Sequence, residues 1–424
     1  MNVLTLKENI NNGLLNEQFN LLYGEFENAK ARYTNACNSF CELFGENREV
    51  KLFSAPGRTE VGGNHTDHQH GCVFAGSVNL DVISFASKNN ENVIRIKSEG
   101  FPMDTINLND LSVKENEIGS AASLIRGMAS IFKQNGYNIG GFDAYTTSNV
   151  LKGSGLSSSA AFEVLIGTML DNLYNNGDIS PVDIAKYSQR AENEYFGKPC
   201  GLMDQMASSV GGFISIDFAN VNKPIINKCE FNLKEYGYSL CIVNTGGNHA
   251  NLTQDYADIT IGNKKVSNFF SKEYLNEVDE VEFYSNLKQL KVEVGDKAVL
   301  QALHFFDETK RAVLEYEALN NNNVDEFLKL VNKSGNSSYK YLQNVYSIQS
   351  PNEQGISLAL ALTERFLNGE GACRVHGGGF AGTIQAFVPN SRLNEYKSMI
   401  ENVFGEGNCY ILNIRSVGGY SFVI

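Results

Sequence analysis

The sequence of 424 residues lacks any apolar run of about 18 residues, the length that a membrane-spanning helix needs. Residues 1–11 also lack the apolar core of a signal peptide. Positive charge is scarce, because 48 Asp and Glu face 35 Lys and Arg and give a formal net charge of -13. Nucleic acids and anionic membranes both require a basic face, so neither is an expected partner.

Cysteine-pairing motifs are also missing: the eight cysteines are scattered over the chain and no C-x-x-C pair occurs. This spacing disfavours zinc ribbons and thioredoxin-type chemistry. We expect reduced thiols, mostly in the core, and therefore a cytoplasmic protein. Hydrophobic residues make up 42% of the chain and charged residues 20%, which is typical of a soluble globular protein with two or three domains at this length.

Helical and strand patterns alternate in both halves of the chain, which predicts the α+β class. Helices are expected at residues 14–45, 120–135, 159 onward, 180–196, 297–319 and 324–344. Strands are expected at residues 50–54, 73–87, 92–97, 140–146, 211–218, 238–243 and 383–388, with a turn at Pro56-Gly57. The polar, proline-containing segment 220–227 divides the chain into expected domains of residues 1–220 and 221–424.

The segment from Leu151 to Ala161 places two glycines and four serines directly ahead of an apolar helix. The backbone N–H groups of such a loop, together with the positive end of the helix dipole, make a site for an anion such as phosphate. It is not a Walker loop, because no Gly-Lys-Ser/Thr follows the glycines. An ordinary capped helix after a flexible turn explains the same residues equally well.

Residues 55–71 carry an arginine, two carboxylates, an asparagine and three of the six histidines between glycines. Short donors and acceptors that are presented on turns suit a small polyhydroxy ligand. By residue type, His65, Asp67, His68 and His70 could instead form a metal cluster, but their spacing matches no familiar ligand pattern.

Two further segments carry chemistry. Glu192 lies near the end of an expected helix, and Asp204 lies among apolar residues after a Pro-Cys-Gly break. Asp204 either orients or deprotonates a hydroxyl in a cleft, or it caps the helix from Gln205 onward. A second glycine loop, from Val375 to Gly382, could close on the same ligand from another domain.

These motifs, in this order, resemble the GHMP small-molecule kinases and, within them, the galactokinase branch. The matching segments are Pro56-Gly-Arg58, His65-Thr-Asp67, Gly153 to Ala161, Pro199 to Gln205 and Gly377 to Gly382. The resemblance implies a two-domain α+β fold. Its N-terminal domain would be a ribosomal-protein-S5-like mixed sheet with helices, its C-terminal domain would be ferredoxin-like, and the active site would lie between them.

The resemblance also implies an activity, the ATP-dependent phosphorylation of the anomeric hydroxyl of galactose to give α-galactose 1-phosphate and ADP. ATP and Mg²⁺ are the implied cofactors, the sugar and ATP are the implied partners, and a monomer or weak dimer is expected. A kinase for a related sugar such as galacturonate is one alternative. A non-catalytic sensor of sugar and ATP is an alternative from another class.

The implied roles fall on particular residues. Asp204 would orient or deprotonate the sugar C1 hydroxyl, and Arg58 would stabilise charge on the transferring phosphoryl. Ser159 and Glu192 would be the Mg²⁺ ligands. The implied ATP loop comprises Gly153, Ser154, Gly155, Leu156, Ser157, Ser158 and Ser159, braced by the loop from Gly377 to Gly382. The implied sugar-binding set comprises Asn64, His65, Thr66, Asp67, Gly201 and Tyr256.

The sugar segment departs from the galactokinase pattern at two positions. The family usually has Gly-Glu-His-Thr-Asp-Tyr, where this chain has Asn64 in place of the glutamate and His68 in place of the tyrosine. The family asparagine after Pro-Gly-Arg-x is also replaced, by Glu60. Because the family glutamate grips the sugar's 6-hydroxyl and Asn64 is neutral, a 6-carboxylate would no longer be repelled. Galactose and galacturonate therefore both stay open, and the identity of the sugar depends on Asn64.

Overall fold

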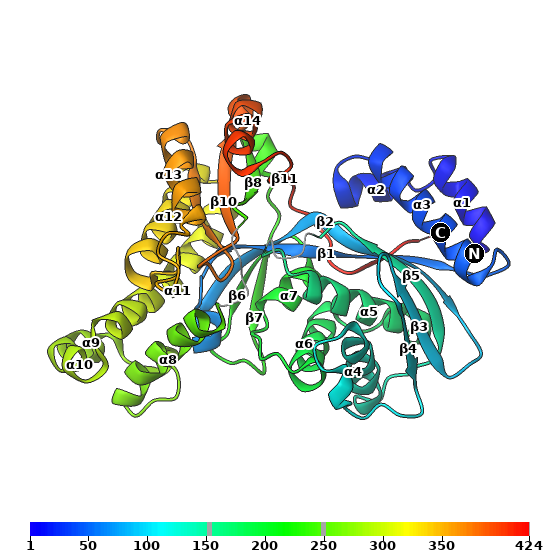
Figure 1. Cartoon of the computed structure of the whole chain (residues 1–424), viewed down its shortest axis with the longest axis horizontal. Coiled ribbons are helices and arrows are strands. Elements are labelled where there is room, and N and C mark those ends of the chain that lie inside the picture. Colours follow the sequence, from blue (N-terminus) through cyan, green and yellow to red (C-terminus); the bar gives the residue numbers. More distant parts are fainter. Residues whose placement is uncertain (151–154, 247–251, 424) are drawn as a thin grey trace.

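The computed structural model describes residues 1–150, 155–246 and 252–423, and it contains two β-sheets with helices packed against them (Figure 1). All strand pairs of the first sheet are antiparallel except β3 with β5. Its strand order is β12 (Tyr420–Ser421), β1 (Lys51–Gly62), β2 (Cys72–Lys88), β5 (Phe142–Ser148), β3 (Val93–Ser98) and β4 (Met103–Asn107), and β6 (Phe213–Asp217) pairs with both β2 and β7 (Ile225–Cys229).

The second sheet is antiparallel throughout. Its strand order is β11 (Cys409–Leu412), β8 (Tyr238–Asn244), β10 (Thr383–Pro389) and β9 (Ala372–His376). In chain order this is 4-1-3-2, with helices between the first two strands and between the last two. That is the βαββαβ arrangement of ferredoxin-like domains, so the expected C-terminal architecture and the α+β class are confirmed.

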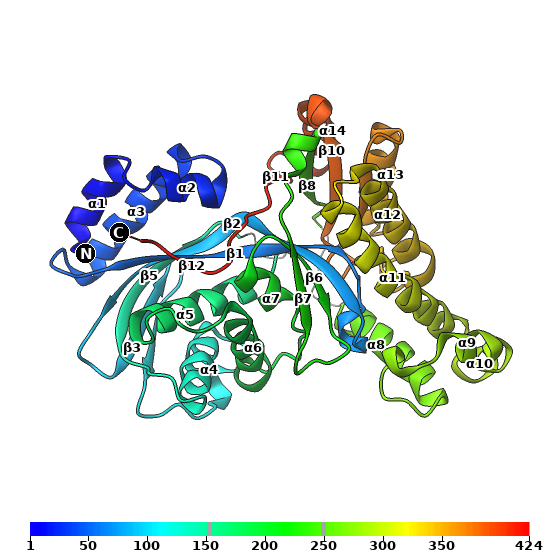
Figure 2. The ribbon, with the colours of Figure 1, turned by 180° about the vertical axis from the view of Figure 1, so that it is seen from behind.

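Helices cover both faces of the first sheet. The three N-terminal helices on one face are α1 (Val3–Asn11), α2 (Asn16–Tyr23) and α3 (Glu27–Phe44), and the other face carries α4 (Ala121–Gln134), α5 (Ser158–Tyr174), α6 (Pro181–Ala191) and α7 (Met203–Val210). Side chains of a strand alternate between faces. Accordingly Leu52 packs in the core under the N-terminal helices, whereas Phe53 packs in the main core. Figure 2 shows from behind that the two ends of the chain lie side by side.

The remaining helices belong to the second half of the chain. They are α8 (Thr253–Phe269), α9 (Glu280–Ser285), α10 (Leu287–Val294), α11 (Asp296–Asn320), α12 (Val324–Ser337), α13 (Gly355–Leu367) and α14 (Leu393–Phe404). The long helix α11 contacts β2 of the first sheet as well as α12, which packs on β9 of the second sheet. It therefore ties the two halves together. No helix in the described part of the chain combines the length and the apolar composition needed to cross a bilayer.

The expected turn at Pro56-Gly57 is wrong. Strand β1 continues through both residues, with a register shift between Pro56 and Arg58. A Cβ atom at residue 57 would lie 2.8 Å from the carbonyl oxygen of Leu156, and the backbone N–H of Arg58 donates to that oxygen at 3.1 Å. Gly57 therefore lets the strand approach the Leu156 backbone closely, and it does not reverse the chain.

Two other expectations changed in detail. The helical segment 14–45 is broken into α2 and α3 at Gly24, whose φ of 72° ends α2 in the left-handed region. The helix expected at 180–196 ends at Ala191 and continues as a π-helical turn, Glu192–Phe196. The domain boundary at residue 220 stays a prediction. The chain passes from the first sheet to the second between β7, which pairs with β6, and β8, which pairs with β10 and β11. We propose that the domain boundary lies there, although β12 returns to pair with β1 of the first sheet.

Candidate active site

Arg58 of β1 and Asp204 in the first turn of α7 meet at the centre of the candidate site. Arg58 Nε donates to Asp204 Oδ1 at 2.7 Å, and Arg58 Nη2 lies 2.7 Å from the same oxygen. Arg58 is 6% exposed, whereas the Asp204 side chain is 33% exposed. A nearly buried guanidinium thus holds a carboxylate that is still open to a ligand.

The helix-cap alternative for Asp204 is wrong, because α7 begins at Met203 with Leu202 as its N-cap residue. Burial alone would raise the pKa of Asp204, but the charge and hydrogen bonds of Arg58, with a hydrogen bond from Ser157, hold this pKa below its ordinary value. Asp204 is therefore ionised at neutral pH, and it lies where the dipole of α7 favours a negative charge.

The expected ATP loop reaches the same place. Gly153 and Ser154 lie outside the described residues; the described part of the loop begins at Gly155. Ser157 Oγ donates to Asp204 Oδ2, and Arg58 Nη1 donates to the carbonyl oxygen of Gly155. Leu156 is buried, and Ser158 begins α5.

The N-terminus of α5 suits an anion. Its N-cap residue, Ser157, has a φ of 55° and makes no side-chain hydrogen bond to the helix. The first backbone N–H groups of this 17-residue helix are therefore not satisfied by their cap residue. Free N–H groups at a helix N-terminus favour a bound phosphate, as the sequence pattern indicates.

Glu192 lies beside the start of α5, at the beginning of the π-helical turn. Ser159 Oγ donates to Glu192 Oε1 at 3.3 Å, and Lys198 Nζ lies 3.1 Å from the same oxygen. Hydroxyl and carboxylate oxygens are the ligands that Mg²⁺ prefers. Glu192 already pairs with one positive group, the ammonium of Lys198. The hydroxyl of Ser159 and the carboxylate of Glu192 would therefore fit a divalent cation.

A second carboxylate, Glu163, lies behind Glu192 and was not anticipated from the sequence. Gln205 Nε2 donates to Glu192 Oε2 at 2.7 Å and lies 3.2 Å from Glu163 Oε2. Burial, reinforced by the charge of Glu192, raises the pKa of Glu163 well above its ordinary value. The sequence signals it only as a single carboxylate within the otherwise apolar segment Ala160–Ile166.

Asp67 and Gly201 adjoin each other. A Cβ atom at residue 201 would lie 1.9 Å from Asp67 Oδ2, so no larger residue fits there without displacing that carboxylate. Burial and then the charge of Asp204 raise the pKa of Asp67 to about 6. The structure thus brings the His65-Thr-Asp67 segment and the Pro199-Cys-Gly201 segment to the same part of the site as Asp204.

Three of the expected sugar-binding residues form hydrogen bonds with backbone carbonyl groups of the second glycine loop. Asn64 Nδ2 donates to the carbonyl oxygen of Gly377 at 2.8 Å. His65 Nε2 lies 3.0 Å from the carbonyl oxygen of Gly378, and Tyr256 OH donates to that of Gly379 at 3.0 Å. Asn64 is 1% exposed. These hydrogen bonds bring the motifs of the two halves together.

The two glycine loops also touch. A Cβ atom at Gly377 would lie 3.8 Å from the Cα of Gly155, and one at Gly155 would lie 3.1 Å from His376 Nδ1. The second glycine loop therefore packs against the expected ATP loop, as a brace would.

Thr66 and the histidines of the loop have other surroundings. Thr66 is fully buried, and its Oγ1 donates to the carbonyl oxygens of Gly63 at 2.8 Å and Cys72 at 2.7 Å, which closes the loop. His70 stacks on Tyr274 with ring centroids 3.6 Å apart. Within the described ranges no three His, Cys, Asp or Glu side chains are grouped to hold one metal ion, so the metal-cluster alternative gains no support.

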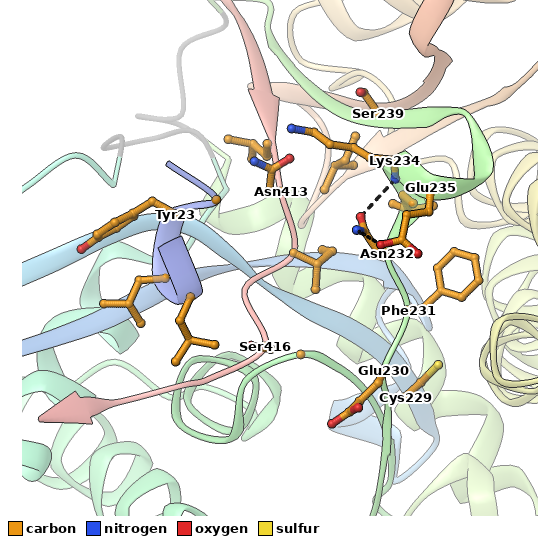
Figure 3. A pocket seen from close by; sticks show the side chains of 18 of the residues that line it. Tyr23, Cys229, Glu230, Phe231, Asn232, Lys234, Glu235, Ser239, Asn413 and Ser416 are labelled. Carbon is orange, nitrogen blue, oxygen red and sulfur yellow. Dashed lines mark hydrogen bonds between the residues drawn. The ribbon is translucent and has the colours of Figure 1, made fainter. Parts of the chain in front are cut away.

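A separate cavity of about 710 Å³ opens where α2, β7 and β8 meet (Figure 3). Tyr23, Glu230, Asn232 and Asn413 are among the residues that line it. None of the candidate site residues within the described segments lies on its walls. The cavity is therefore distinct from the Arg58–Asp204 site.

Comparison with known proteins matches two segments of the chain to known families and most of its length to galactokinases. The GHMP kinases N terminal domain family matches residues 123–212, and the galactokinase galactose-binding signature matches residues 38–88. A galactokinase of Clostridium tetani is 29% identical over 383 residues, covering 87% of this chain and 91% of the relative. One from Lactococcus lactis subsp. lactis is 28% identical, covering 87% of this chain and 90% of the relative.

Solved structures agree. The crystal structure of Lactococcus lactis galactokinase complexed with galactose superimposes with a TM-score of 0.78 at 25% identity, covering 92% of this chain and 100% of that one. Methanococcus jannaschii mevalonate kinase shares the fold, with a TM-score of 0.61 at 14% identity over 86% of this chain and 98% of that one. The chain therefore has a match to the GHMP kinase N-terminal domain at residues 123–212 and carries the galactokinase galactose-binding signature at residues 38–88, and over most of its length it is similar to galactokinases.

Proposed function

We propose that this chain is an ATP-dependent galactokinase, which transfers the terminal phosphoryl group of ATP to the anomeric hydroxyl of galactose. The observation that carries the proposal is the contact of Arg58, Asp204 and Ser157. Three motifs from separate parts of the chain meet there, and they supply a guanidinium, an ionised carboxylate and a helix N-terminus. Phosphoryl transfer requires chiefly positioning and electrostatic stabilisation, and these groups supply both.

In this proposal Asp204 accepts a hydrogen bond from the sugar C1 hydroxyl and orients its oxygen toward the phosphoryl group. The lowered pKa of Asp204 makes it a weak base, so orientation contributes more than proton removal before transfer. Arg58 keeps Asp204 ionised and offers positive charge to the transferring group. Asp67, with Gly201 beside it, would hold a sugar hydroxyl.

The N-terminus of α5, from Gly155 to Ser159, would receive the phosphates of ATP. Ser159 and Glu192 would hold Mg²⁺, which when bound neutralises phosphate charge. Lys198 would then leave Glu192 Oε1 or share it.

We assign galactose rather than galacturonate as the substrate because of the surroundings of Asn64. A preference for a 6-carboxylate would depend on this side chain, which is 1% exposed and bonded to protein groups. We also propose a cytoplasmic location, since all eight cysteines are unpaired thiols.

The test is a substrate panel of galactose, galacturonate, galactosamine and glucose with Mg-ATP, with the product identified by phosphorus NMR. We expect galactose to have the highest kcat/KM and to yield the α-1-phosphate. A higher kcat/KM for galacturonate would overturn the assignment of the sugar. Binding of sugar and ATP without any ADP release would instead support the sensor.

A further inference from the structure

Two of the three departures from the galactokinase pattern, Glu60 and Asn64, are bonded to each other. Glu60 Oε1 accepts a hydrogen bond from Asn64 Nδ2 at 2.7 Å, and the two residues are 4% and 1% exposed. In such a buried setting a donor or acceptor that lost its partner would have no water to replace it, so each of the two groups depends on the other. The two positions are therefore parts of one structural unit.

Glu60 is in turn held by the second half of the chain. Arg374 of β9 is fully buried, and its Nη2 lies 3.2 Å from Glu60 Oε1. The other side of this guanidinium faces Glu308 of α11, with Nη1 3.9 Å from Glu308 Oε1. Arg374 is thus shared between two buried carboxylates, and Glu60 connects β1 to the C-terminal sheet.

The neighbours of Asn64 leave its amide only one orientation. Its Nδ2 donates to both Glu60 and the carbonyl oxygen of Gly377, whereas its Oδ1 accepts from Asn344 Nδ2 at 2.7 Å. A flipped amide would place an oxygen against two acceptors and an NH₂ group against a donor. Asn344 also donates to the carbonyl oxygen of Gly378 at 3.1 Å, so the same network fixes the glycine loop.

We propose that Glu60 is a positioning residue of the sugar site. Its carboxylate orients the Asn64 amide, and through this amide the sugar segment binds the Gly377–Gly378 backbone. The same carboxylate excludes an acidic side chain from position 64. The inference rests on the proposed function, since the site that it positions is the proposed galactose site. Asn64 then acts on the sugar indirectly, by fixing the backbone that leads into His65 and Asp67.

The exclusion follows from charge and geometry. A carboxylate at position 64 would direct an oxygen at both Glu60 Oε1 and the carbonyl oxygen of Gly377, where an N–H now donates. Arg374 cannot offset this second charge, because Glu308 already shares it. The glutamate that galactokinases carry at this position is therefore compatible with this chain only if Glu60 changes as well.

The experiment is a double-mutant cycle with isosteric changes, Glu60→Gln, Asn64→Asp and the two combined. We expect Asn64→Asp to raise the sugar KM about tenfold or more, with a smaller rise in the ATP KM, because an acceptor would replace a donor. Glu60→Gln alone should raise the sugar KM only about threefold, since the glutamine oxygen still accepts from Asn64. The combined variant should recover part of the loss that Asn64→Asp causes.

A matched control is Glu117→Gln, which removes the charge of a carboxylate that is bound to Arg126 at 2.6 Å and has no bond to Glu60 or Asn64 among the hydrogen bonds described above. It should leave both KM values unchanged, although the melting temperature falls. A combined variant with a sugar KM equal to or higher than that of Asn64→Asp would overturn the pairing. The melting temperatures of the wild type, Glu60→Gln, Asn64→Asp and the combined variant give a second double-mutant cycle, which measures stability and does not depend on turnover. Wild-type protein that phosphorylates no sugar would overturn only the proposed function, because the melting-temperature cycle would still test the pairing.

Discussion

Gly201 and Asp67 occupy adjoining space, and a Cβ atom at residue 201 would lie 1.9 Å from Asp67 Oδ2. Real Cβ atoms do not approach an oxygen this closely, so an added methyl group must displace the carboxylate. The glycine of the Pro199-Cys-Gly201 segment therefore fixes the position of the aspartate in the His65-Thr-Asp67 segment. This contact joins two motifs that are far apart in the sequence.

Gly201→Ala should lower kcat/KM for galactose about tenfold or more, because it displaces a carboxylate that holds a sugar hydroxyl. The ATP KM should change much less, since Asp67 belongs to the proposed sugar-binding set and not to the ATP loop. Steady-state kinetics with each substrate varied in turn measures both. In an Asp67→Ala background the same Gly201→Ala change should cost little more, because the clash is gone. An equal loss in both backgrounds would contradict the steric explanation.

Asp204→Asn should lower kcat about a hundredfold or more, because it removes the charge that orients the acceptor hydroxyl, while the amide keeps the shape. Sugar and ATP KM values should change little, since neither ground state depends on that charge alone. Single-turnover phosphoryl transfer measures the effect, and a melting temperature close to that of wild type excludes misfolding. Undiminished turnover would show that Asp204 has no catalytic role.

The meeting of Arg58, Asp204 and the α5 N-terminus could be anticipated from the sequence, because each lies in a motif whose residue types and order are distinctive. The surroundings of Asn64 could not. Its partners Glu60, Gly377 and Asn344 come from three distant segments, and nothing in the local pattern shows that they converge on one amide. The sugar preference therefore could not be inferred from Asn64 alone.

In the fold, too, some features could be predicted from the sequence and others could not. Strand β3, whose residues alternate clearly, lies where the pattern predicts it, because alternation reports directly on burial of one face. The continuation of β1 through Pro56-Gly57 was missed, because a Pro-Gly pair is typical of a turn. Here the glycine serves a contact with Leu156, which lies in a segment remote from β1.

The dependence of sugar binding on pH should reflect Asp67, whose pKa is raised to about 6. Below this pH the carboxyl group is protonated and loses an acceptor for the sugar, so kcat/KM for galactose should fall as pH decreases through about 6. Asp67→Asn should lower kcat/KM at neutral pH and flatten this limb of the profile. Burial also raises the pKa of Glu60, to about 7. A limb that persists in Asp67→Asn and disappears in Glu60→Gln would assign it to Glu60.

Ser159→Ala should raise the Mg²⁺ concentration required for half-maximal activity by about tenfold, because one oxygen ligand of a hard cation is lost. The sugar KM should remain near that of wild type. Binding of Mn²⁺ in the presence of a non-hydrolysable ATP analogue, followed by electron paramagnetic resonance, measures metal affinity without turnover. Unchanged metal affinity would remove Ser159 from the proposed ligand set.

Glu315 of α11 should make the protein less stable as pH rises. Its side chain is fully buried against Gly62, and neither carboxyl oxygen has a hydrogen-bond partner in the described part of the chain. Burial, with the charge of Glu308, raises the pKa of Glu315 well above its ordinary value, so the folded protein binds a proton that the unfolded chain releases. Stability is then complete below about pH 4.3 and falls by up to about 1.4 kcal/mol per pH unit as pH rises toward the folded pKa.

Glu315→Gln replaces the protonated carboxyl with a neutral isostere, and it should remove this loss. In urea unfolding at pH 5 and pH 9, the variant should gain stability over wild type at pH 9 and differ little at pH 5. Glu308→Gln, about two turns earlier on the same helix α11, is the matched control. Although burial opposes it, His304, Arg311 and Arg374 hold the pKa of Glu308 to about 2, so its charge stabilises the fold at neutral pH. Glu308→Gln should therefore destabilise at both pH values, and the same sign for both variants at pH 9 would contradict the assignment of Glu315 as the protonated member of the cluster.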